Sequence, residues 1–434
     1  MKKLVLGSVL LLGVSPLIGC SVSKGKEAAT VPADIKSKEL VIVLQEGTMV
    51  SSKYRVTSIE KSAKLFEEAN PGVKVTVEQI ASKGYTNALI ERLTNKKPPD
   101  LVFGSFNAPL NEREPFADLL PFFKADKMTT DDLYETMIGM ATVKGKLQGI
   151  PMAPNPLAVF YNKEWFDKAG IPYPAKDWTW EQFMNLSIKL QAANRIPGKD
   201  VFGSAVPIDV QLFESLAQSS GQSVVSPDGN RVSGYLNSKP VAEALTKLLY
   251  HMNTSKASKS VSSYNSVLTE LNTFNAGMGI GIATMFSFLE ENPNTAGKFG
   301  FAALPRLEKG VRANALTFSL LSIAASSKQK ELAWKFMKDV ILNGDSQFQK
   351  DWGKQELLTT KSAIQKSGQH LIPGMNVLID EFNYAFKPIT YRNAALSSVQ
   401  LADKRLFAST TEAEVMAALA DLAEEIDKQL KDKK

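Results

Sequence analysis

The 434-residue chain is poor in the residues on which disulfides, thiol catalysis and transition-metal sites depend. Its single cysteine is Cys20, so no disulfide can form within the chain. Its only two histidines, His251 and His370, lie far apart in the sequence. A transition-metal site would therefore rest almost entirely on carboxylates, and a Cys–His nucleophilic pair is excluded once Cys20 is assigned to a lipid, as argued below. We expect no metal ion and no cofactor.

The chain also lacks the short motifs that mark common hydrolases and nucleotide-binding enzymes. It contains no Gly-x-Ser-x-Gly, no His-Glu-x-x-His and no Gly-Lys-Ser/Thr sequence. The glycine cluster 277–281 lies between a predicted helix and a predicted strand, whereas a phosphate-binding loop precedes its helix. We interpret Gly277 as the residue that ends the helix. The sequence predicts no enzymatic activity, although a glycosidase that uses two separated carboxylates stays open as an alternative.

Long runs of one charge sign are missing, and so are long apolar runs beyond the N-terminal segment. The formal net charge is +6, and basic and acidic residues are interspersed along the chain. This pattern gives little support to nucleic-acid binding, which favours concentrated basic patches. No apolar run after residue 19 approaches the ~20 residues that a transmembrane helix needs. We expect no nucleic-acid partner.

The N-terminal segment is built like an export signal. Lys2 and Lys3 precede the run 4–18, which is apolar apart from glycine, serine and one proline, and which is too short to span a bilayer. Its last residues, Leu17-Ile18-Gly19-Cys20, resemble the lipobox of bacterial lipoproteins, in which cleavage precedes an acylated cysteine. We therefore predict a signal peptide over 1–19, a lipid on Cys20 and a polar, flexible tether over 20–38.

Beyond the tether, apolar runs and amphipathic stretches alternate. Strands are predicted at 40–44, 73–77 and 101–103, with helices around 59–66 and 86–94 between them, which implies parallel pairing through right-handed crossovers. The alternation resumes with strands at 157–161, 280–285, 299–303 and 318–324, and with helices at 180–193, 241–252, 266–276, 328–342 and 411–430. Thr179 with Gln182 and Thr411 with Glu414 fit capping boxes. A chain of this length exceeds one hydrophobic core, so we predict two α/β lobes.

Several short segments occur in an order that resembles one protein family. They are 99–103 (PDLVF), 145–151 (GKLQGIP), 157–163 (LAVFYNK), 177–181 (DWTWE), 274–279 (FNAGMG), 299–305 and 330–336 (KELAWKF). Together they resemble the bacterial extracellular solute-binding proteins of carbohydrate ABC importers, nearly continuously from residue 40 to residue 430. The segment 274–279 departs from the family's usual small-residue-then-Met ending.

The resemblance implies a two-lobe, type II periplasmic-binding-protein-like fold with a hinge and a ligand cleft between the lobes. It predicts that the chain crosses between lobes after Pro151, near Leu304 and near Leu357. The first lobe would comprise 40–153 plus 305–355, and the second 154–304 plus 356–430. Closure of the cleft would shift the population toward a shape that the permease recognises.

The function implied is that of a monomeric, lipid-anchored binding component of an ABC importer. It would capture a carbohydrate or oligosaccharide and deliver it to permease subunits in the membrane. The location implied is the extracytoplasmic face of the cell membrane, and a tethered receptor suits a monoderm bacterium. The alternatives are a polyamine or a sugar acid bound by the same scaffold, or a surface glycoside hydrolase.

A sugar offers hydroxyl groups in fixed directions and a weakly apolar face, so its site needs polar side chains and aromatic plates. The resemblance places candidate ligand contacts largely where predicted strands end, at Glu46, Asn107, Asn155, Phe286, Phe288, Trp352 and Tyr391. The two asparagines stand where maltose-binding members of the family have carboxylates. Core packing stays open for the phenylalanines, and loop capping for the asparagines. Trp334 and the tryptophans at 165, 178 and 180 are predicted to pack in the core.

Overall fold

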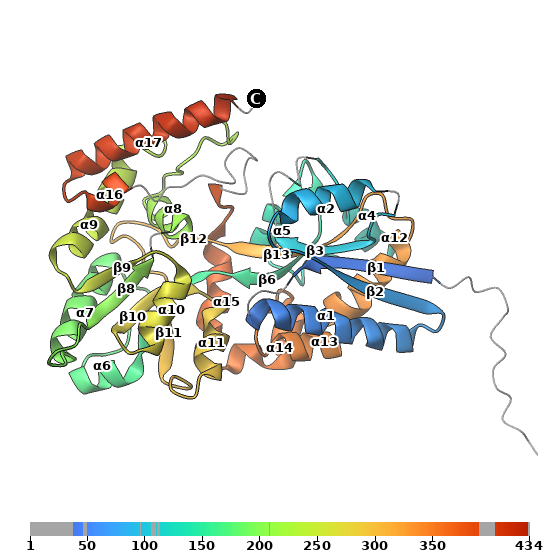
Figure 1. Cartoon of the computed structure of the whole chain (residues 1–434), viewed down its shortest axis with the longest axis horizontal. Coiled ribbons are helices and arrows are strands. Elements are labelled where there is room, and N and C mark those ends of the chain that lie inside the picture. Colours follow the sequence, from blue (N-terminus) through green and yellow to red (C-terminus); the bar gives the residue numbers. More distant parts are fainter. Residues whose placement is uncertain are drawn as a thin grey trace, which may run out of the picture.

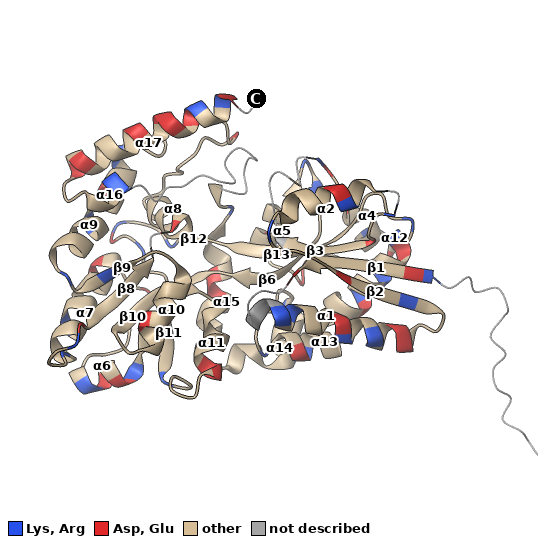
Figure 2. Cartoon of the chain, viewed as in Figure 1, with Lys and Arg blue, Asp and Glu red and all other residues tan. Residues whose placement is uncertain are grey.

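The computed structural model describes residues 38–46, 50–95, 97–105, 110, 113–207, 209–389 and 404–432. It contains two α/β lobes that lie side by side (Figure 1). Cys20, the predicted signal and the predicted tether up to residue 37 lie outside the described residues, and Lys38, its last predicted residue, begins the first strand. Within the described part, no helix has both the length and the apolarity required to cross a bilayer. Figure 2 shows basic and acidic residues interspersed over both lobes, as the sequence predicts.

The first lobe is built on a five-stranded sheet in the order β2-β1-β3-β13-β6. These strands are β1 (Lys38–Gln45), β2 (Val73–Ile80), β3 (Leu101–Ser105), β6 (Ile150–Asn155) and β13 (Thr317–Ile323). The predicted parallel pairing of β1 with β2 and β3 is confirmed, whereas β13 runs antiparallel to β3 and β6. Strand β1 is sandwiched between two clusters of apolar side chains, which explains why it reads as a continuous apolar run.

The helices of the first lobe cover opposite faces of this sheet. Ile59 of α1 packs in one cluster with Ile42, and Leu89 of α2 packs in another with Val43. Successive strand residues face opposite ways, so two helices can cover one strand. The helices of this part are α1 (Val50–Ala69), α2 (Tyr85–Thr94), α4 (Leu120–Ala125), α5 (Glu135–Ala141), α12 (Lys330–Phe336), the π-helix η1 (Met337–Leu342) and α13 (Gln347–Trp352). A small hairpin pairs β4 (Thr142–Val143) with β5 (Lys146–Leu147).

The second lobe has a mixed sheet in the order β11-β7-β10-β8-β9. Its strands are β7 (Leu157–Asn162), β8 (Phe202–Pro207), β9 (Ser258–Val261), β10 (Ala276–Ile282) and β11 (Phe299–Ala303). Its helices are α6 (Lys163–Ala169), α7 (Trp180–Ala193), α8 (Val210–Ser219), α9 (Lys239–Thr254), α10 (Tyr264–Asn272), α11 (Met285–Glu291), α16 (Lys404–Ala408) and α17 (Glu412–Asp432).

Both predicted capping boxes are confirmed. The Thr179 hydroxyl accepts from the Gln182 amide at 3.3 Å, and the Gln182 side chain accepts from the Thr179 amide at 2.9 Å. Thr411 and Glu414 exchange the same pair of bonds at 3.3 and 3.1 Å. Such reciprocal bonds satisfy backbone donors that a helix start leaves open.

The glycine cluster is a strand and not the end of a helix, so the interpretation of Gly277 as a helix C-cap is wrong. Strand β10 begins at Ala276, and the strand predicted to end at Met285 ends at Ile282. A Cβ atom on Gly277 would lie 2.6 Å from the Trp165 ring, and one on Gly279 would lie 2.6 Å from Val267. These glycines let helices α6 and α10 approach the sheet closely, which is a tertiary requirement that local pattern does not reveal.

The tryptophans predicted to pack in the core do so. Trp165 and Trp180 are buried at or near helix starts, Trp178 donates its indole N–H to the Ala303 carbonyl at 2.7 Å, and Trp334 is buried on α12. The apolar stripe of α17 is a packing face, because Val415, Leu419, Leu422, Ile426 and Leu430 are all buried.

The connections between the lobes run through three stretches of chain. The first joins β6 to β7 at Pro156, and the second runs from β11 to β13 through β12 (Asn314–Ala315). The third contains α14 (Lys361–Ser367), η2 (Gln369–Leu371), α15 (Met375–Asp380), η3 (Glu381–Tyr384) and β14 (Ala385–Phe386), which pairs with β12. The predicted limits assign α14 to the second lobe, yet the Ser362 amide donates to Asp132 of the first lobe at 2.8 Å. The exact lobe limits stay a prediction.

A chain of buried polar side chains crosses the interior of the second lobe. His251 on α9 shares a 2.9 Å hydrogen bond with Ser258, whose hydroxyl lies 2.6 Å from that of Ser204, and Ser187 donates to Ser204 at 2.9 Å. Burial lowers the pKa of His251 to about 4, so the imidazole is neutral at pH 7. The chain therefore exchanges hydrogen bonds in the interior without a net charge.

We predict that removing this imidazole changes how stability depends on pH. Its pKa is lower in the folded than in the unfolded protein, so its contribution is complete above pH ~6.5 and is lost as the pH falls toward 4. His251→Gln should therefore remove about 2 kcal/mol of the acid destabilisation seen between these pH values in urea unfolding. His370→Gln, at the other histidine, is the matched control. Equal slopes for His251→Gln and the parent protein would contradict the prediction.

Candidate functional site

The carboxyl ends of strands from both sheets lie beside the connections between the lobes. In the first lobe, Leu44 of β1 pairs with Phe103 of β3, and β3 reaches the start of β13. In the second lobe, Ile282 at the end of β10 pairs with Leu157, the first residue after the first connection. Strands β8 and β9 run parallel to β10 and end on the same side. Ligands of open α/β sheets bind outside the carboxyl ends of strands, so these ends define the candidate site.

The polar candidates that the structure describes lie at this edge. Asn155 ends β6 and accepts a hydrogen bond from the Thr284 amide at 3.1 Å, which joins the first connection to the start of α11. Glu46 follows β1 and is exposed; its backbone amide donates to the Ile80 carbonyl at 2.7 Å. Asn107 and Tyr391 lie outside the described residues, so their placement stays a prediction.

The aromatic candidates differ in what they can offer a ligand. Phe286 and Phe288 stand on helix α11, not directly after a strand as predicted. Phe286 is buried, and its ring centroid lies 5.3 Å from that of Phe301 in the core, whereas Phe288 is half-buried. Of the two, Phe288 is the more accessible residue and therefore the better candidate for stacking on a sugar.

Trp352 is a core residue in this structure and offers no ring face to a ligand. Only 1% of its surface is exposed. Its ring centroid lies 4.9 Å from that of Phe348, 5.9 Å from that of Phe103 and 6.4 Å from that of Tyr54. The predicted ligand contact at Trp352 does not fit this burial. The neighbouring rings come from three separate elements, so the sequence does not show that they enclose Trp352.

The sequence reasoning missed a polar pair in the second lobe. Tyr264 begins α10 after β9, and its hydroxyl donates to an Asp209 carboxylate oxygen at 2.5 Å. The same oxygen caps α8 by accepting from the Gln211 amide at 2.8 Å. Burial, and then the Asp209 charge, raise the pKa of Tyr264 well above its ordinary value, so the phenol stays protonated and donates. Both residues follow strand ends, which is the signal that could have found them.

A second missed group stands near the start of α1 in the first lobe. The Arg55 Nε atom donates to Glu356 at 2.6 Å, and the Glu356 side chain is 1% exposed. The Gln369 amide donates to the carbonyls of Glu356 and Gly353, both at 2.8 Å, and so holds the turn that carries this carboxylate. Gln355, in the same turn, donates to Glu291 of α11 in the second lobe at 2.8 Å. No sequence signal links Arg55 to a carboxylate so far along the chain.

The edge thus combines a half-buried carboxylate, a phenol, an arginine and a half-buried aromatic ring. Such groups can hydrogen-bond hydroxyls and stack on an apolar ring face. Among the described residues, no three histidine, cysteine, aspartate or glutamate side chains gather as a metal site would require. The arrangement therefore suits recognition of a polar organic solute.

Comparison with known proteins agrees with this geometry. Residues 52–353 match the family model of the bacterial extracellular solute-binding proteins. The chain belongs to this family. The family and the two-lobe α/β fold predicted from the sequence are thereby confirmed.

Relatives of this family member include a putative binding protein of Brucella abortus, 28% identical over 309 residues, which are 68% of this chain and 69% of the relative. The sugar-binding protein MalE of Xanthomonas citri has a similar structure, with a TM-score of 0.75, 17% identity, and coverage of 91% of this chain and 98% of that one. The structure of UgpB of Mycobacterium tuberculosis in complex with glycerophosphocholine is also similar, with a TM-score of 0.69 and 16% identity. The match covers 90% of this chain and 98% of that one. At these identities the structural likeness shows the fold.

Proposed function

We propose that this family member is the solute-binding component of an ABC importer, and that it captures a carbohydrate or oligosaccharide between its lobes for delivery to the membrane permease. The observation that carries the proposal is that strand ends of both sheets bring hydrogen-bonding groups and an aromatic ring to one edge, beside the connections between the lobes. The sugar-binding protein of Xanthomonas citri shares the fold.

The chemistry of Asp209 and Tyr264 supports a ligand rich in hydroxyl groups. The Asp209 oxygen that receives the Tyr264 and Gln211 bonds is held in place, and the second carboxylate oxygen is oriented with it. A fixed carboxylate accepts strongly from hydroxyl donors, and such charge-assisted bonds are stronger than neutral ones. Phe288 supplies the aromatic face in the same lobe.

The proposal includes attachment to the outer face of the cell membrane through a lipid on Cys20, with 20–38 as the tether. A receptor that acts as a monomer needs to stay near its permease while solute diffuses past, and a lipid serves this need. The short apolar segment 4–18 and the lipobox-like ending at Cys20 support this part of the proposal.

A second candidate is a non-sugar solute bound in the same place. The observation that favours it is the fold shared with UgpB, whose structure holds glycerophosphocholine. Arg55 would suit an anionic group, although Glu356 already balances its charge. The predicted alternatives, a sugar acid or a polyamine, belong to this candidate.

A thermal-shift screen of the purified chain separates the candidates. The panel comprises mono- and oligosaccharides, sugar acids, glycerophosphodiesters, polyamines and short peptides. A ligand that binds only the folded state raises the melting temperature by mass action. A shift with a neutral saccharide supports the proposal, and shifts confined to the other classes would overturn the choice of solute. Release of a cleaved product during incubation would point to the hydrolase alternative.

We predict that Asp209→Asn weakens binding of the saccharide found in the screen by about 10- to 100-fold, because one charge-assisted hydrogen bond is lost. Asparagine also caps helices well, so α8 should stay intact and the melting temperature without solute should be unchanged. Isothermal titration calorimetry measures the affinity. Glu243→Gln, at an exposed carboxylate on α9, is the matched control. Equal affinities of the two variants would exclude Asp209 from the site.

A further inference from the structure

The second connection holds the first through a single side chain. The Asn314 amide oxygen accepts from the Leu157 backbone N–H at 2.9 Å, and its nitrogen donates to the Leu157 carbonyl at 2.8 Å. Asn314 thus satisfies both backbone groups of the residue at which β7 begins, as a neighbouring strand would. Both residues are fully buried.

The third connection joins the same group through charge. The Asn314 nitrogen also donates to Glu381 at 2.8 Å, and Arg312 donates to the other Glu381 oxygen at 2.5 Å. Arg312 contacts Asp380 at 3.0 Å as well, and its guanidinium lies 3.7 Å from the centre of the Tyr384 ring. Side-chain exposure is 9% for Arg312 and 1% for Glu381. Arg312, Asn314, Asp380 and Glu381, with the Leu157 backbone, are called the hinge network below.

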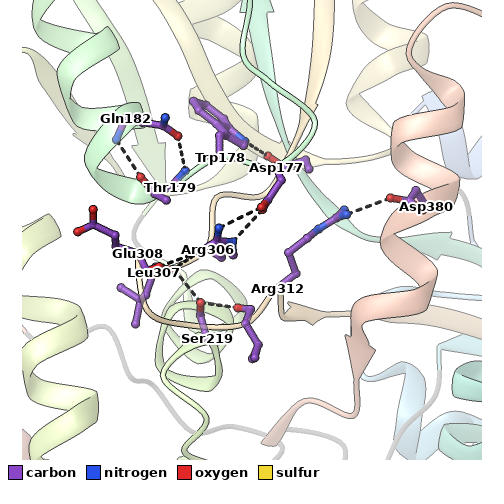
Figure 3. A network of polar contacts seen from close by, with 12 residues as sticks. Asp177, Trp178, Thr179, Gln182, Ser219, Arg306, Leu307, Glu308, Arg312 and Asp380 are labelled. Carbon is purple, nitrogen blue, oxygen red and sulfur yellow. Dashed lines mark hydrogen bonds and ion pairs between the residues drawn. The ribbon is translucent and has the colours of Figure 1, made fainter.

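The two flanks of the hinge network are fixed to different lobes. On one side, Arg306 forms a two-point ion pair with Asp177 at 2.8 and 3.0 Å, and Ser219 binds the backbone of Leu307 and Val311 (Figure 3). These contacts hold 306–311 to the second lobe.

On the other side, η3 lies against helix α5 of the first lobe. The Thr136 hydroxyl donates to the Phe382 carbonyl at 2.8 Å, and the Phe382 ring meets the Tyr134 ring edge-on at 5.0 Å. Arg312 reaches from the segment held by the second lobe toward Asp380, as Figure 3 shows. The hinge network therefore spans the boundary between the lobes at the point where all three connections meet.

We infer that the hinge network lies on the axis about which the two lobes rotate. We also infer that it sets how widely the unliganded protein opens. Hinges are commonly a few residues at element ends, and here the second and third connections are joined by the short β12–β14 pairing together with these side chains. The inference goes beyond the nature of the solute, because it requires only that two lobes move.

Substitutions in the hinge network should change how far the lobes can move, because its charged side chains are buried. Removing one partner of a buried ion pair leaves the other uncompensated, so the local structure rearranges. Glu381→Gln removes one of the two carboxylates that Arg312 contacts, and Asn314→Ala removes the side chain that bonds both backbone groups of Leu157. If the hinge network fixes the axis of rotation, either change should widen the range of angles between the lobes.

The absence of cysteine beyond Cys20 makes a direct measurement practical. In the full chain with Cys20→Ser, spin labels are placed at Lys64→Cys on α1 and Lys168→Cys on α6, both exposed positions in different lobes. Pulsed electron paramagnetic resonance then gives the distribution of distances between the lobes without any solute. We expect Glu381→Gln and Asn314→Ala to widen this distribution about twofold relative to the parent.

Asp177→Asn is the matched control, because it breaks an ion pair of the same segment that lies within the second lobe. Its distance distribution should equal that of the parent. Far-ultraviolet circular dichroism checks that each variant is folded, and the conservative Glu381→Gln decides the outcome if Asn314→Ala does not fold. Unchanged distributions for Glu381→Gln, or equal widening by Asp177→Asn, would overturn the inference. Because no solute is used, a wrong choice of solute class leaves this result unaffected.

Discussion

Replacing Trp352 by alanine should destabilise the protein by about 3–5 kcal/mol, which is the cost typical of removing a large buried aromatic side chain. Trp352 is 1% exposed and packs against rings from α1, β3 and α13. Its removal would leave a cavity under the start of α1. Urea unfolding followed by circular dichroism measures the loss.

The control for this experiment is Trp352→Phe, which keeps an aromatic ring and should cost about 1–2 kcal/mol. Measured under conditions where Trp352→Ala stays folded, solute affinity separates packing from ligand contact. A variant of parental stability that no longer binds solute would show that the ring stacks on the ligand after all. We expect the opposite result, with a large loss of stability and little change in the affinity of the folded protein.

Replacing Cys20 by alanine should move the protein completely from the membrane fraction to the soluble extracytoplasmic fraction. Under the proposed function, attachment depends on acyl chains on Cys20. Each buried methylene of an acyl chain contributes about 0.8 kcal/mol to membrane binding. Stable anchoring needs two acyl chains, or one chain together with a second membrane-binding signal. Fractionation of cells and mass spectrometry of the N-terminal peptide measure the change.

Ser21→Ala is the matched control for Cys20→Ala, since it alters the neighbouring residue and keeps the thiol. Solute binding by the released protein should equal that of the anchored one, because the candidate site lies in the folded body. Under the proposed function, solute uptake by cells should fall, since the released protein no longer stays near the membrane. Retention of Cys20→Ala in the membrane fraction would refute the lipid proposal.

Features carried by one element could be predicted closely from the sequence. The strand at 299–303 and the helix at 180–193 have the predicted ends, and both capping boxes form. Each depends on residues within a few positions of one another, so a linear pattern contains the needed information. The stripe of α17 is equally local, because its spacing alone tells which face packs.

Predictions that needed a second element were less successful. In the sequence, the glycine cluster 277–281 resembles the end of a helix. In the structure it is a strand, and Trp165 and Val267 lie too close to it for larger side chains at Gly277 and Gly279. Phe286 follows a predicted strand in the sequence, but it stands on α11 and packs on Phe301. The sequence shows neither contact, because the partners lie in elements whose relative position depends on the sheet.

The sequence by itself determined the alternation of strands and helices, the family, and the features that suggest export and a lipid on Cys20. Only the tertiary structure decided which side chains meet. Tyr264 and Asp209 are 55 positions apart, and Asn314 and Leu157 are 157 apart. Periodicity reports the surroundings of one helix or strand, whereas such contacts depend on strand order and on three separate connections between lobes. Long-range contacts are therefore where the candidate site and the hinge network arise.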